Sequence, residues 1–478
     1  MRLPNVSDLP FPVGTILDHG QMNVLMEYCF NDVDATYAFY LKSTEQIKFR
    51  EQLTVKHGID FINYNDVKIG KEIFRLSLEK AGVVCYNYDP ENGRTPRQTP
   101  RSHIALKDGI PNYICFGHPN FERVRAIFAS TVITTTKSSL LNLSAIVDGL
   151  EYKFGTGGIH ASVENESFEA NDEMMIYDID VTSLYPSIAI ENGYYPEHLG
   201  PKFVEVYRNL REQRVHYPKG TPENAMLKLA LNGVYGASND PYSIFYDPLF
   251  TMKITIGGQL MIAMLVDSLR KVTHLRVIQA NTDGITFYLP RCGKQLVDDL
   301  CKKWEALTGL HLEHVEYSKM AVADVNSYIA QGTNGKVKRK GRYEYDLEWH
   351  QNASALVVPK VAEQVILNKL PIKSTVENWP DKMDFMLRAK TPRSSQLVLD
   401  VGWGDIPLEN TQRYYITPVG GQMFKIMPPL AKTPDKWRRM AVQKDCCICP
   451  CNDIADAVLP IDHSWYIKEI QKLVLGVI

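Results

Sequence analysis

One stretch of the chain places two carboxylates directly before a turn. Residues 174–177 form an apolar run with strand character that ends in Asp178 and Asp180. Successive strand side chains alternate faces, so both carboxylates point the same way. Two hydroxyl residues follow, and then Tyr185 and Pro186, a residue that suits the first turn of a helix. A carboxylate facing the N–H groups of such a turn can hold a divalent cation beside a phosphate chain. A solvated acidic strand end is the alternative.

A third carboxylate lies at the tip of a predicted hairpin. Residues 275–280 and 285–289 are two β-rich runs, and the segment 281–284, Asn-Thr-Asp-Gly, joins them. Asp-Gly between apolar runs is a strong hairpin signal, and this hairpin presents Asp283 at its tip. An ordinary surface hairpin would have the same sequence. The segment therefore indicates a functional site only together with the motifs that precede it in the chain.

A predicted helix over about 223–235 carries three polar residues on one stripe. Residues 221–222, Thr-Pro, supply its cap and its first turn. At about 100° per residue, Asn232 and Tyr235 lie about 40° and −20° from Lys228. A cation, an amide and a phenol side by side suit an anionic, planar ligand. The alternative is that Asn232 and Tyr235 cap a helix end.

Basic residues gather in three further segments. The segment 336–342, KVKRKGR, holds five cations in seven residues and leads into Tyr343, as a segment that follows phosphates does. A predicted helix over 202–217 and a loop over 89–103 each carry three arginines, namely Arg208, Arg211 and Arg214, and Arg94, Arg97 and Arg101. Solvated charged surfaces remain the alternative for each of them.

The composition fits a soluble globular protein of several structural units. The chain has 478 residues, of which 45% are hydrophobic and 23% charged, and its net charge is −2. Any affinity for nucleic acid must therefore come from local basic patches. Nine cysteines and no signal peptide favour reduced thiols in the cytoplasm, and four of them, Cys446, Cys447, Cys449 and Cys451, lack the spaced second pair of a zinc site. The apolar stretch 254–266 is too short and too polar to span a bilayer.

The N-terminal part begins with an extended leader, residues 1–20, and continues as a predicted helix over about 21–42. Tyr28 and Asp32 share one face of this helix at a spacing of four residues. Further on, Gly157 and Gly158 allow a close backbone approach, although no Gly-Lys-Ser/Thr follows as in a phosphate-binding P-loop. The C-terminal part is predicted to hold helices over 355–368, 375–388 and 463–473.

Three of these stretches, in this order, resemble motifs of family B DNA polymerases, and the match looks closest to phage enzymes. DVTSLYPSI (180–188) resembles the first polymerase motif. KLALNGVYG (228–236) resembles Lys-x-x-x-Asn-Ser-x-Tyr-Gly, with Gly233 in place of Ser. The hairpin segment resembles Asp-Thr-Asp-Ser, with Asn281 for the first Asp and Gly284 for Ser. A reverse transcriptase does not fit the Lys-x-x-x-Asn helix.

The resemblance implies an α+β fold, a right hand of palm, fingers and thumb behind an RNase H-like exonuclease remnant. The expected divisions are an exonuclease remnant (1–45), a connecting region (46–150), palm (151–203), fingers (204–236), palm with the primer-binding segment (237–350) and thumb (351–478). The implied activity is template-directed DNA synthesis from dNTPs on a primer, in phage DNA replication. The alternative is a non-catalytic DNA-binding subunit whose hairpin motif has decayed at Asn281.

The resemblance also implies the site residues. Asp180 and Asp283 would be catalytic and, with the backbone of Val181, would hold two Mg²⁺ ions, for which Mn²⁺ can substitute. The dNTP would contact Ser183, Leu184, Tyr185, Arg211, Arg214, Lys228, Asn232 and Tyr235. DNA would contact Gly157, Gly158, Lys338, Lys340, Arg342 and Tyr343. Asp178, which shares a strand face with Asp180, is only a fallback ligand that could compensate for Asn281; the main assignment does not need it, so the effect of Asp178→Ala is expected to be mild.

Tyr28 and Asp32 resemble the third exonuclease motif of the family, and the first two motifs are expected upstream of Met1. The chain alone is therefore expected to lack exonuclease activity. A separate polypeptide carrying the missing carboxylates is expected to dock on residues 1–45, as part of a split polymerase. A truncated chain would have the same sequence. Replisome factors are further expected partners, and no membrane association is expected. The expected location is the cytoplasm, which for a viral protein is the cytoplasm of the host cell.

Overall fold

The computed structural model describes residues 3, 5–91, 93–137, 143–429 and 436–477. They form two compact units, one of residues 49–338 and one that joins residues 1–48 to residues 339–478. Helix α1 (His19–His57) passes from the second of these units into the first. The units are described separately below.

Unit 49–338 alternates helices with short strands. Its longer helices are α2 (Asp66–Lys80), α3 (Pro119–Ser130), α4 (Leu184–Glu191), α5 (Lys202–Val215), α6 (Pro222–Ala237), α7 (Pro248–Leu269) and α8 (Lys294–Thr308). Its first strands are β1 (Tyr86–Asp89), β2 (Gly93–Pro96), β3 (Ile104–Ala105), β4 (Val132–Ile133), β5 (Ser144–Val147), β6 (Leu150–Lys153) and β7 (His160–Ser162). The later ones are β8 (Glu166–Glu169), β9 (Met174–Val181), β10 (Arg276–Asn281), β11 (Gly284–Pro290), β12 (Leu312–Asp324), β13 (Ser327–Gly332) and β14 (Val337–Lys340).

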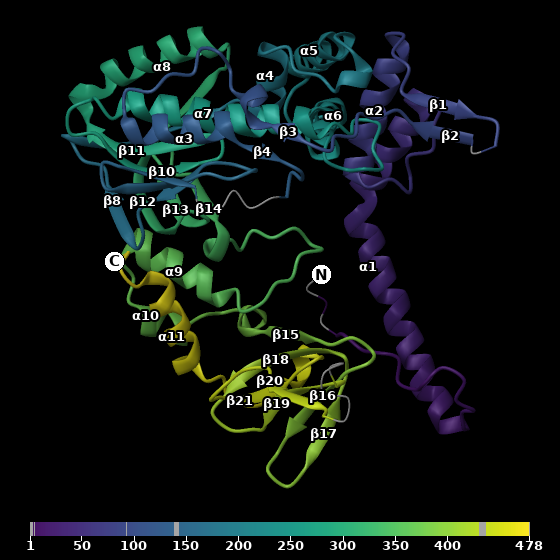
Figure 1. Ribbon diagram of the computed structural model, residues 1–478. Helices are drawn as coiled ribbons and strands as arrows, with labels where there is room; N and C mark the ends of the chain where they lie inside the picture. The colour runs from purple at the N-terminus through teal and green to yellow at the C-terminus, as the bar shows by residue number, and fades with distance from the viewer. Residues whose placement is uncertain (1–2, 4, 92, 138–142, 430–435, 478) are drawn as a thin grey trace. The chain divides into compact units, whose positions relative to one another are not determined.

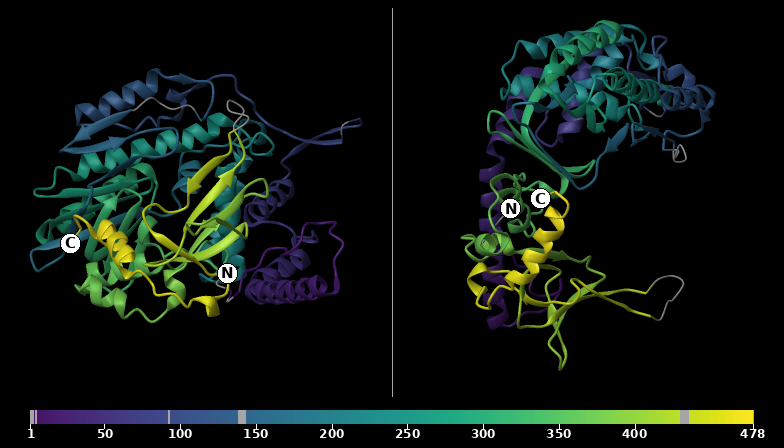
Figure 2. Two further views of the ribbon diagram at one scale, coloured as in Figure 1. Left: turned by 90° about the horizontal axis from the view of Figure 1, so that it is seen from below. Right: turned by 90° about the vertical axis from the view of Figure 1, so that its left-hand side faces the viewer.

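A ten-stranded sheet forms the frame of this unit. Its strand order is β14-β13-β12-β9-β11-β10-β7-β6-β5, and β8 pairs with β12. The strand that ends in Asp180, β9, thus lies in the middle, between β12 and the hairpin β10–β11, and pairs antiparallel with both neighbours. Figure 1, with two further views in Figure 2, shows α3, α7 and α8 gathered on one side of this sheet.

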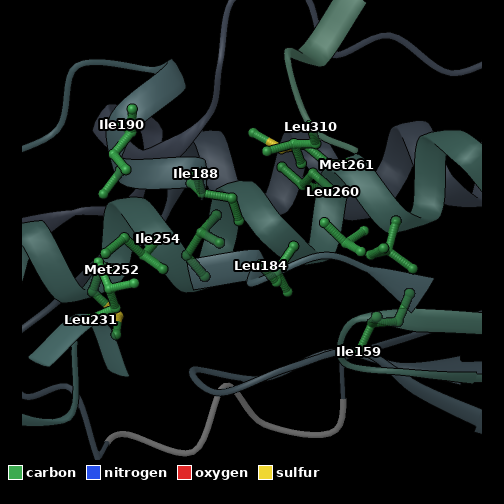
Figure 3. Close-up of a cluster of buried hydrophobic side chains, with 14 of the residues drawn as sticks. Ile159, Leu184, Ile188, Ile190, Leu231, Met252, Ile254, Leu260, Met261 and Leu310 are labelled. Atoms are coloured by element: carbon green, nitrogen blue, oxygen red, sulfur yellow. The ribbon is translucent and has the colours of Figure 1, made fainter. Parts of the chain in front are cut away.

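Helix α7 is the centre of the hydrophobic core. Almost all of its side chains are buried, and they pack against α4 and α8. The close-up in Figure 3 shows Leu184 and Ile188 of α4 facing Leu260 and Met261 of α7. The helices approach closely because Gly258 carries no side chain, and a Cβ there would lie 3.0 Å from Ile188 Cδ1.

By length and composition α7 could cross a membrane, since it runs for 22 residues with a mean hydropathy of 1.7 in its most apolar window. It is longer than the apolar stretch apparent in the sequence. However, 89% of that window is buried inside the fold, as is typical of a core helix.

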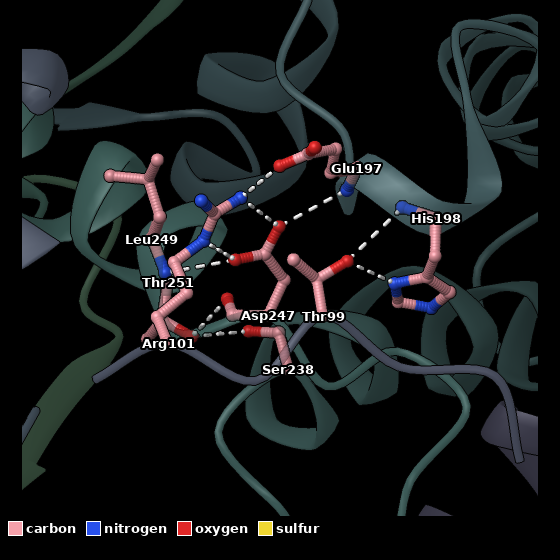
Figure 4. A network of polar contacts seen from close by, with 8 residues as sticks. All are labelled: Thr99, Arg101, Glu197, His198, Ser238, Asp247, Leu249 and Thr251. Carbon is pink, nitrogen blue, oxygen red and sulfur yellow. Dashed lines mark hydrogen bonds and ion pairs between the residues drawn. The ribbon is translucent and has the colours of Figure 1, made fainter. Parts of the chain in front are cut away.

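A polar network fixes the start of α7 (Figure 4). The buried Asp247 caps the helix by accepting a hydrogen bond from Leu249 N at 3.0 Å. The same carboxylate accepts Arg101 Nε at 2.8 Å and the backbone N–H of Glu197 at 3.1 Å. Arg101, one of the three arginines of the basic loop 89–103, is thus committed to holding its loop and the segment before α5 against α7.

Helices α2, α5 and α6 pack into a small bundle. Gly70 of α2 lies so close to α6 that a Cβ there would clash with Leu229 O at 2.1 Å. Phe74 of α2 packs between the rings of Phe203 and Tyr207 of α5, and the Tyr207 hydroxyl donates to Leu231 O at 2.7 Å. These buried contacts leave the opposite side of α6, which carries Lys228, exposed.

The other unit contains helices α9 (Val357–Asn368), α10 (Ile372–Glu377) and α11 (His463–Val474). Its strands are β15 (Leu387–Lys390), β16 (Gln396–Asp400), β17 (Asp405–Leu408), β18 (Thr411–Thr417), β19 (Gln422–Met427), β20 (Arg438–Ala441) and β21 (Cys447–Pro450). They form a three-stranded sheet, β15-β18-β21, and a four-stranded sheet, β17-β16-β19-β20.

The leader is tied to this unit by backbone hydrogen bonds. Arg413 Nη1 donates to Leu3 O at 2.7 Å, and Val6 N donates to Asn452 O at 3.2 Å. Thr411 N donates to the carboxylate of Asp8 at 3.1 Å. Residues that are far apart in sequence therefore form one unit.

Two helix predictions need correction. The helix predicted over 375–388 is wrong, because α10 ends at Glu377, a 3₁₀ turn follows over Lys382–Phe385, and β15 begins at Leu387. Pro380 explains the break, since it lacks an N–H and cannot continue a helix. The helix predicted over 21–42 is too short, because α1 runs to His57.

Candidate active site

Strand pairing brings Asp180 and Asp283 together. In the ladder between β9 and β11, Asp180 stands opposite Gly284, the residue after Asp283. The backbone N–H of Val181 donates to the carbonyl oxygen of Asp283 at 2.7 Å, which fixes the hairpin tip against the end of β9. The predicted hairpin is confirmed, and its turn places Thr282 at a positive φ of 57°.

Gly284 makes room for the Asp180 carboxylate. A Cβ at this position would lie 1.8 Å from Asp180 Oδ1, 3.0 Å from its Cγ and 3.1 Å from Ile179 O. A residue with a side chain would therefore have to displace the carboxylate. The lack of a side chain at Gly284 is therefore a steric requirement of this site.

The turn after β9 directs a tyrosine toward the site. Ser183 adopts a left-handed conformation, with φ 51° and ψ 54°, and α4 begins at the next residue. Ser187 Oγ donates to Thr182 O at 3.0 Å, which closes the turn. Tyr185 of α4 stacks on Tyr235 of α6, with ring centroids 4.1 Å apart and an interplanar angle of 27°.

The two tyrosines form one aromatic surface beside the acidic centre. Burial, and after it the negative charge of Asp283, raise the pKa of Tyr185. Tyr185 comes four residues after Val181, whose backbone N–H donates to the Asp283 carbonyl oxygen at 2.7 Å. Asp283 and the stacked pair therefore belong to one site.

Asp178 differs from Asp180 because protein donors surround its carboxylate. Thr286 Oγ1 donates to Asp178 Oδ1 at 2.6 Å, and Tyr317 OH donates to Asp178 Oδ2 at 2.7 Å. Its side chain is 5% exposed, whereas that of Asp180 is 42% exposed. Both oxygens of Asp178 are thus engaged below the surface, and it is poorly placed to act as the spare metal ligand expected from the sequence.

Lys338 joins the two carboxylates. Its Nζ lies 3.4 Å from Asp178 Oδ2 and 3.4 Å from Asp180 Oδ2. Burial lowers the pKa of Lys338, but both carboxylates act against burial and raise it well above its usual range. Burial and the neighbouring Asp178 raise the pKa of Asp180, although Lys338 partly offsets them. The ammonium therefore stays charged and acts as the internal counter-ion of this acidic centre.

The glycine-rich loop lies against the hairpin. Thr282 N donates to Ile159 O at 2.9 Å, and a Cβ on Gly158 would lie 3.0 Å from Thr282 Oγ1. Gln259, a buried residue of α7, donates from Nε2 to Gly155 O at 2.9 Å and accepts from Gly155 N at 3.0 Å. The loop that contains Gly157 is thus positioned next to the candidate site by the core helix.

The three residues of the predicted polar stripe project from α6 as expected. Lys228 and Asn232 are exposed, and Tyr235 is half-buried against Tyr185. Of the two arginines predicted to bind the triphosphate, Arg211 is in an ion pair within the protein and Arg214 has a weaker contact. Arg211 pairs with Glu191 at 2.8 Å, and Arg214 Nε lies 3.5 Å from Asn224 Oδ1, a long and weak contact.

The residues at this centre fit a divalent cation that is also held by a substrate. Two carboxylates and the carbonyl oxygens of a tight turn are hard ligands of the kind that Mg²⁺ takes, and Mg²⁺ is commonly bound by one or two carboxylates together with substrate phosphates. Among the residues that the structure describes, no group of three or more His, Cys, Asp or Glu side chains could hold a metal ion. The protein thus offers part of a coordination shell, and the space that Gly284 leaves keeps Asp180 close to Asp283.

Several predicted site residues lie in the other unit. Lys340 and Arg342 are exposed, whereas Tyr343 is fully buried and donates to Leu473 O at 3.0 Å. Tyr343 therefore serves the packing of α11, and in this structure it is not accessible to DNA. The predicted DNA contact Lys338 belongs to the carboxylate centre instead.

Tyr28 and Asp32 contact each other on α1, and a hydrogen bond to Asp32 raises the pKa of Tyr28. Tyr28 lines a cavity of about 850 Å³ with Asp8, Glu409 and Trp437 of the same unit. The cysteines near residue 450 are free thiols, and Cys449 and Cys451 are buried in a small apolar cluster.

Comparisons with known proteins give a coarse likeness to solved structures. No protein-family model matches the sequence, and a search of curated proteins finds no match. Among solved structures, the chain is similar to the family B DNA polymerase from the hyperthermophilic archaeon Pyrobaculum calidifontis, with a TM-score of 0.45 and 13% identity. The likeness covers 96% of this chain and 57% of that chain, so this chain spans less than two thirds of that polymerase. It is a coarse similarity and says nothing about individual residues.

The sequence did not reveal the buried polar residues whose hydrogen bonds hold the site residues and the glycine-rich loop in place. These are Gln259, Gln279, Thr286 and Tyr317, which lie on separate elements. The one available signal was Gln259, a polar residue within an apolar run. Thr286 and Tyr317 carried no signal, because only the register between β9, β11 and β12 brings them to Asp178.

Proposed function

We propose that this chain is the polymerase part of a family B type DNA polymerase, acting in phage DNA replication. It would add dNTPs to a primer 3′-hydroxyl under the direction of a template strand. The observation that carries the proposal is the convergence of Asp180 and Asp283 beside the stacked rings of Tyr185 and Tyr235. The carboxylate pair suits the metal-bound phosphates of a dNTP, and the aromatic surface suits its sugar or base. Lys228, which is exposed on α6, suits the triphosphate.

In this function the residues of the chain have distinct tasks. Lys228 and Arg214 attract the triphosphate, and Arg211 joins them when phosphate displaces Glu191. The Tyr185 ring lies under the sugar and leaves no room for a 2′-hydroxyl. A divalent cation held by Asp180 and Asp283 supplies charge neutralisation on the phosphates and a lower pKa of the primer hydroxyl.

Primer extension tests the proposal directly. Purified full-length protein is given a labelled primer–template and dNTPs with Mg²⁺ or Mn²⁺. Wild type is expected to extend the primer, and Asp283→Asn to lose at least about 100-fold, since metal charge stabilisation is worth several kcal/mol. Affinity for the duplex should stay within about threefold, because it depends on basic segments and phosphates. A wild type that binds DNA and never extends it would favour the non-catalytic subunit.

We also propose a protein partner for α1. The first half of this helix exposes a stripe of large apolar side chains spaced by three and four residues, namely Met22, Met26, Phe30, Val33, Tyr37 and Tyr40. Phe30 is 65% exposed and Val33 is 63% exposed. A contiguous apolar stripe on a helix is a docking surface for another protein. The proposed occupant is the separate polypeptide that supplies the missing nuclease carboxylates.

Reconstitution tests the partner. The chain mixed with the product of its neighbouring gene is expected to gain 3′→5′ digestion of a primer, which Asp32→Ala removes. Phe30→Glu should prevent the association and leave primer extension by the chain alone unchanged. Strong digestion by the chain alone would overturn the proposal.

A further inference from the structure

Lys338 stands between two carboxylates that have different surroundings. Its Nζ is equally distant from Asp178 and Asp180, at 3.4 Å from each. The Asp178 side chain is 5% exposed and that of Asp180 is 42% exposed. The ammonium thus links a buried acid to an acid that opens toward solvent, and the Lys338 side chain as a whole is 35% exposed.

The buried acid is fully committed to the protein. Tyr317 and Thr286 donate to its two oxygens, and Gln279 Nε2 in turn donates to Thr286 Oγ1 at 3.3 Å. This chain of contacts spans β9, β10, β11 and β12 and fixes Asp178 below the site. An ionised carboxylate held in this way needs a cation nearby, because an unpaired buried charge is costly.

The outer acid has fewer protein partners. Of the side chains that the structure describes, Lys338 is the one that donates to the Asp180 carboxylate. The Asp180 carboxylate rests against the bare Cα of Gly284, and Lys338 reaches its Oδ2 from β14. A cation that binds Asp180 through Oδ2 therefore meets the ammonium at this oxygen.

We propose that Lys338 is a positioning residue that occupies, at Asp180, the place of the divalent cation and gives way to it while remaining anchored on Asp178. The inference rests on the proposed function, because it takes Asp180 as a cation ligand. In the cation-free protein, Lys338 holds Asp180 Oδ2 and neutralises part of the charge of its two carboxylate partners, Asp178 and Asp180. When the divalent cation binds, Lys338 releases Asp180 and keeps its contact with Asp178.

Two substitutions should then change metal affinity in opposite directions. Lys338→Met removes the competing ammonium, so Mn²⁺ should bind more tightly. Asp178→Asn removes the anchor and leaves Lys338 with Asp180 as its single carboxylate partner, so Mn²⁺ should bind more weakly. A purely structural role for this pair would lower the affinity in both variants or leave it unchanged.

The experiment is a Mn²⁺ titration of the full-length protein without DNA, read from the electron paramagnetic resonance signal of free Mn²⁺. Lys338→Met is expected to tighten binding at least about fivefold, and Asp178→Asn to weaken it by a similar factor, which corresponds to about 1 kcal/mol in each direction. Asp180→Asn should abolish binding at this site. Lys336→Met is the matched control, because it removes the same charge from an exposed neighbouring lysine, and it should change the affinity less than twofold.

Unchanged or weaker Mn²⁺ binding by Lys338→Met would overturn the inference, as would a shift of both variants in one direction. If Lys338→Met does not fold, Lys338→Gln replaces it, because the amide still donates to Asp178 without carrying a charge. The inference and the proposed function fail separately. If the two variants shift Mn²⁺ affinity in opposite directions but the protein never extends primers, the inference about Lys338 holds and the proposed polymerase function is wrong. If the protein extends primers but the Mn²⁺ affinities do not shift in this way, the function holds and the inference is wrong.

Discussion

Acidic and aromatic residues come together at two places in the protein. The two places differ in whether long-range strand pairing or local helix geometry positions their side chains. Asp180 and Asp283 come from strands about a hundred residues apart, and the ladder between β9 and β11 sets their relation. Tyr28 and Asp32 lie on one turn of one helix and contact each other locally. Long-range pairing fixes side chains for chemistry, whereas a local pair on an exposed helix needs further residues to make a site.

The first effect concerns Gly284→Ala, which tests whether the strand register sets the acidic centre. A Cβ at this position would lie 1.8 Å from Asp180 Oδ1, so the carboxylate must move. Primer extension should fall at least about tenfold, because displacement of a catalytic group by about 1 Å is costly. The control is Gly20→Ala in the first turn of α1, where φ is not positive and a Cβ would come no closer than 3.4 Å to Asp18 Oδ1. Unchanged primer extension by Gly284→Ala would mean that the Asp180 carboxylate can act from another position, so that the strand register does not set the acidic centre.

The second effect concerns stability. Asp178→Ala leaves Thr286, Tyr317 and Lys338 without their shared acceptor. We expect the free energy of unfolding to fall by about 3 kcal/mol, the low end for breaking a buried ion pair. Chemical denaturation measures it. A loss below about 1 kcal/mol would show that the network is solvated.

The third effect concerns sugar selection. Tyr185→Val removes the ring that stacks on Tyr235 and opens the space beside the acidic centre. Incorporation of ribonucleotides relative to deoxyribonucleotides should rise at least about tenfold, since a lost steric exclusion is worth one or more kcal/mol. Single-nucleotide extension with paired rNTP and dNTP substrates gives the ratio. Tyr242→Val, at an exposed tyrosine, should leave the ratio unchanged.

The smallest effect is expected at the other acidic place. Asp32→Ala removes a surface carboxylate with one local contact, so stability should change by no more than about 0.5 kcal/mol. Primer extension by the chain alone should be unaffected. A large loss of extension would break the comparison, because it would give the local pair a part in the polymerase reaction.

The sequence predicted the parts of the site that follow from local patterns. The strand before Asp180, the hairpin at Asp283 and the stripe on α6 were all visible in residue order and spacing. The role of Lys338 was not, because a lysine in a basic run predicts a phosphate contact. Only the order of strands, with β14 at the edge and β9 in the middle, shows that its side chain reaches inward to Asp178.

The same limit applies to the fold. Individual helices such as α7 and α11 were predictable from their apolar patterns, whereas the union of the leader with the C-terminal unit was not. Arg413 binds Leu3 O, a contact across about four hundred residues that no local pattern contains. Tyr343 illustrates the opposite error, since its position beside cations predicted a DNA contact, although packing against α11 buries it.

The burial of α7 has a consequence for how the protein is made. Several elements that cover this helix, among them β11 and α8, follow it in the chain and leave the ribosome later. At about 5–20 residues per second, the nascent helix stays uncovered for seconds. During this interval its apolar surface is open to chaperones, to aggregation and to the membrane-targeting machinery. Gln259, whose amide later binds both backbone groups of Gly155, meanwhile makes the helix less acceptable to a lipid bilayer.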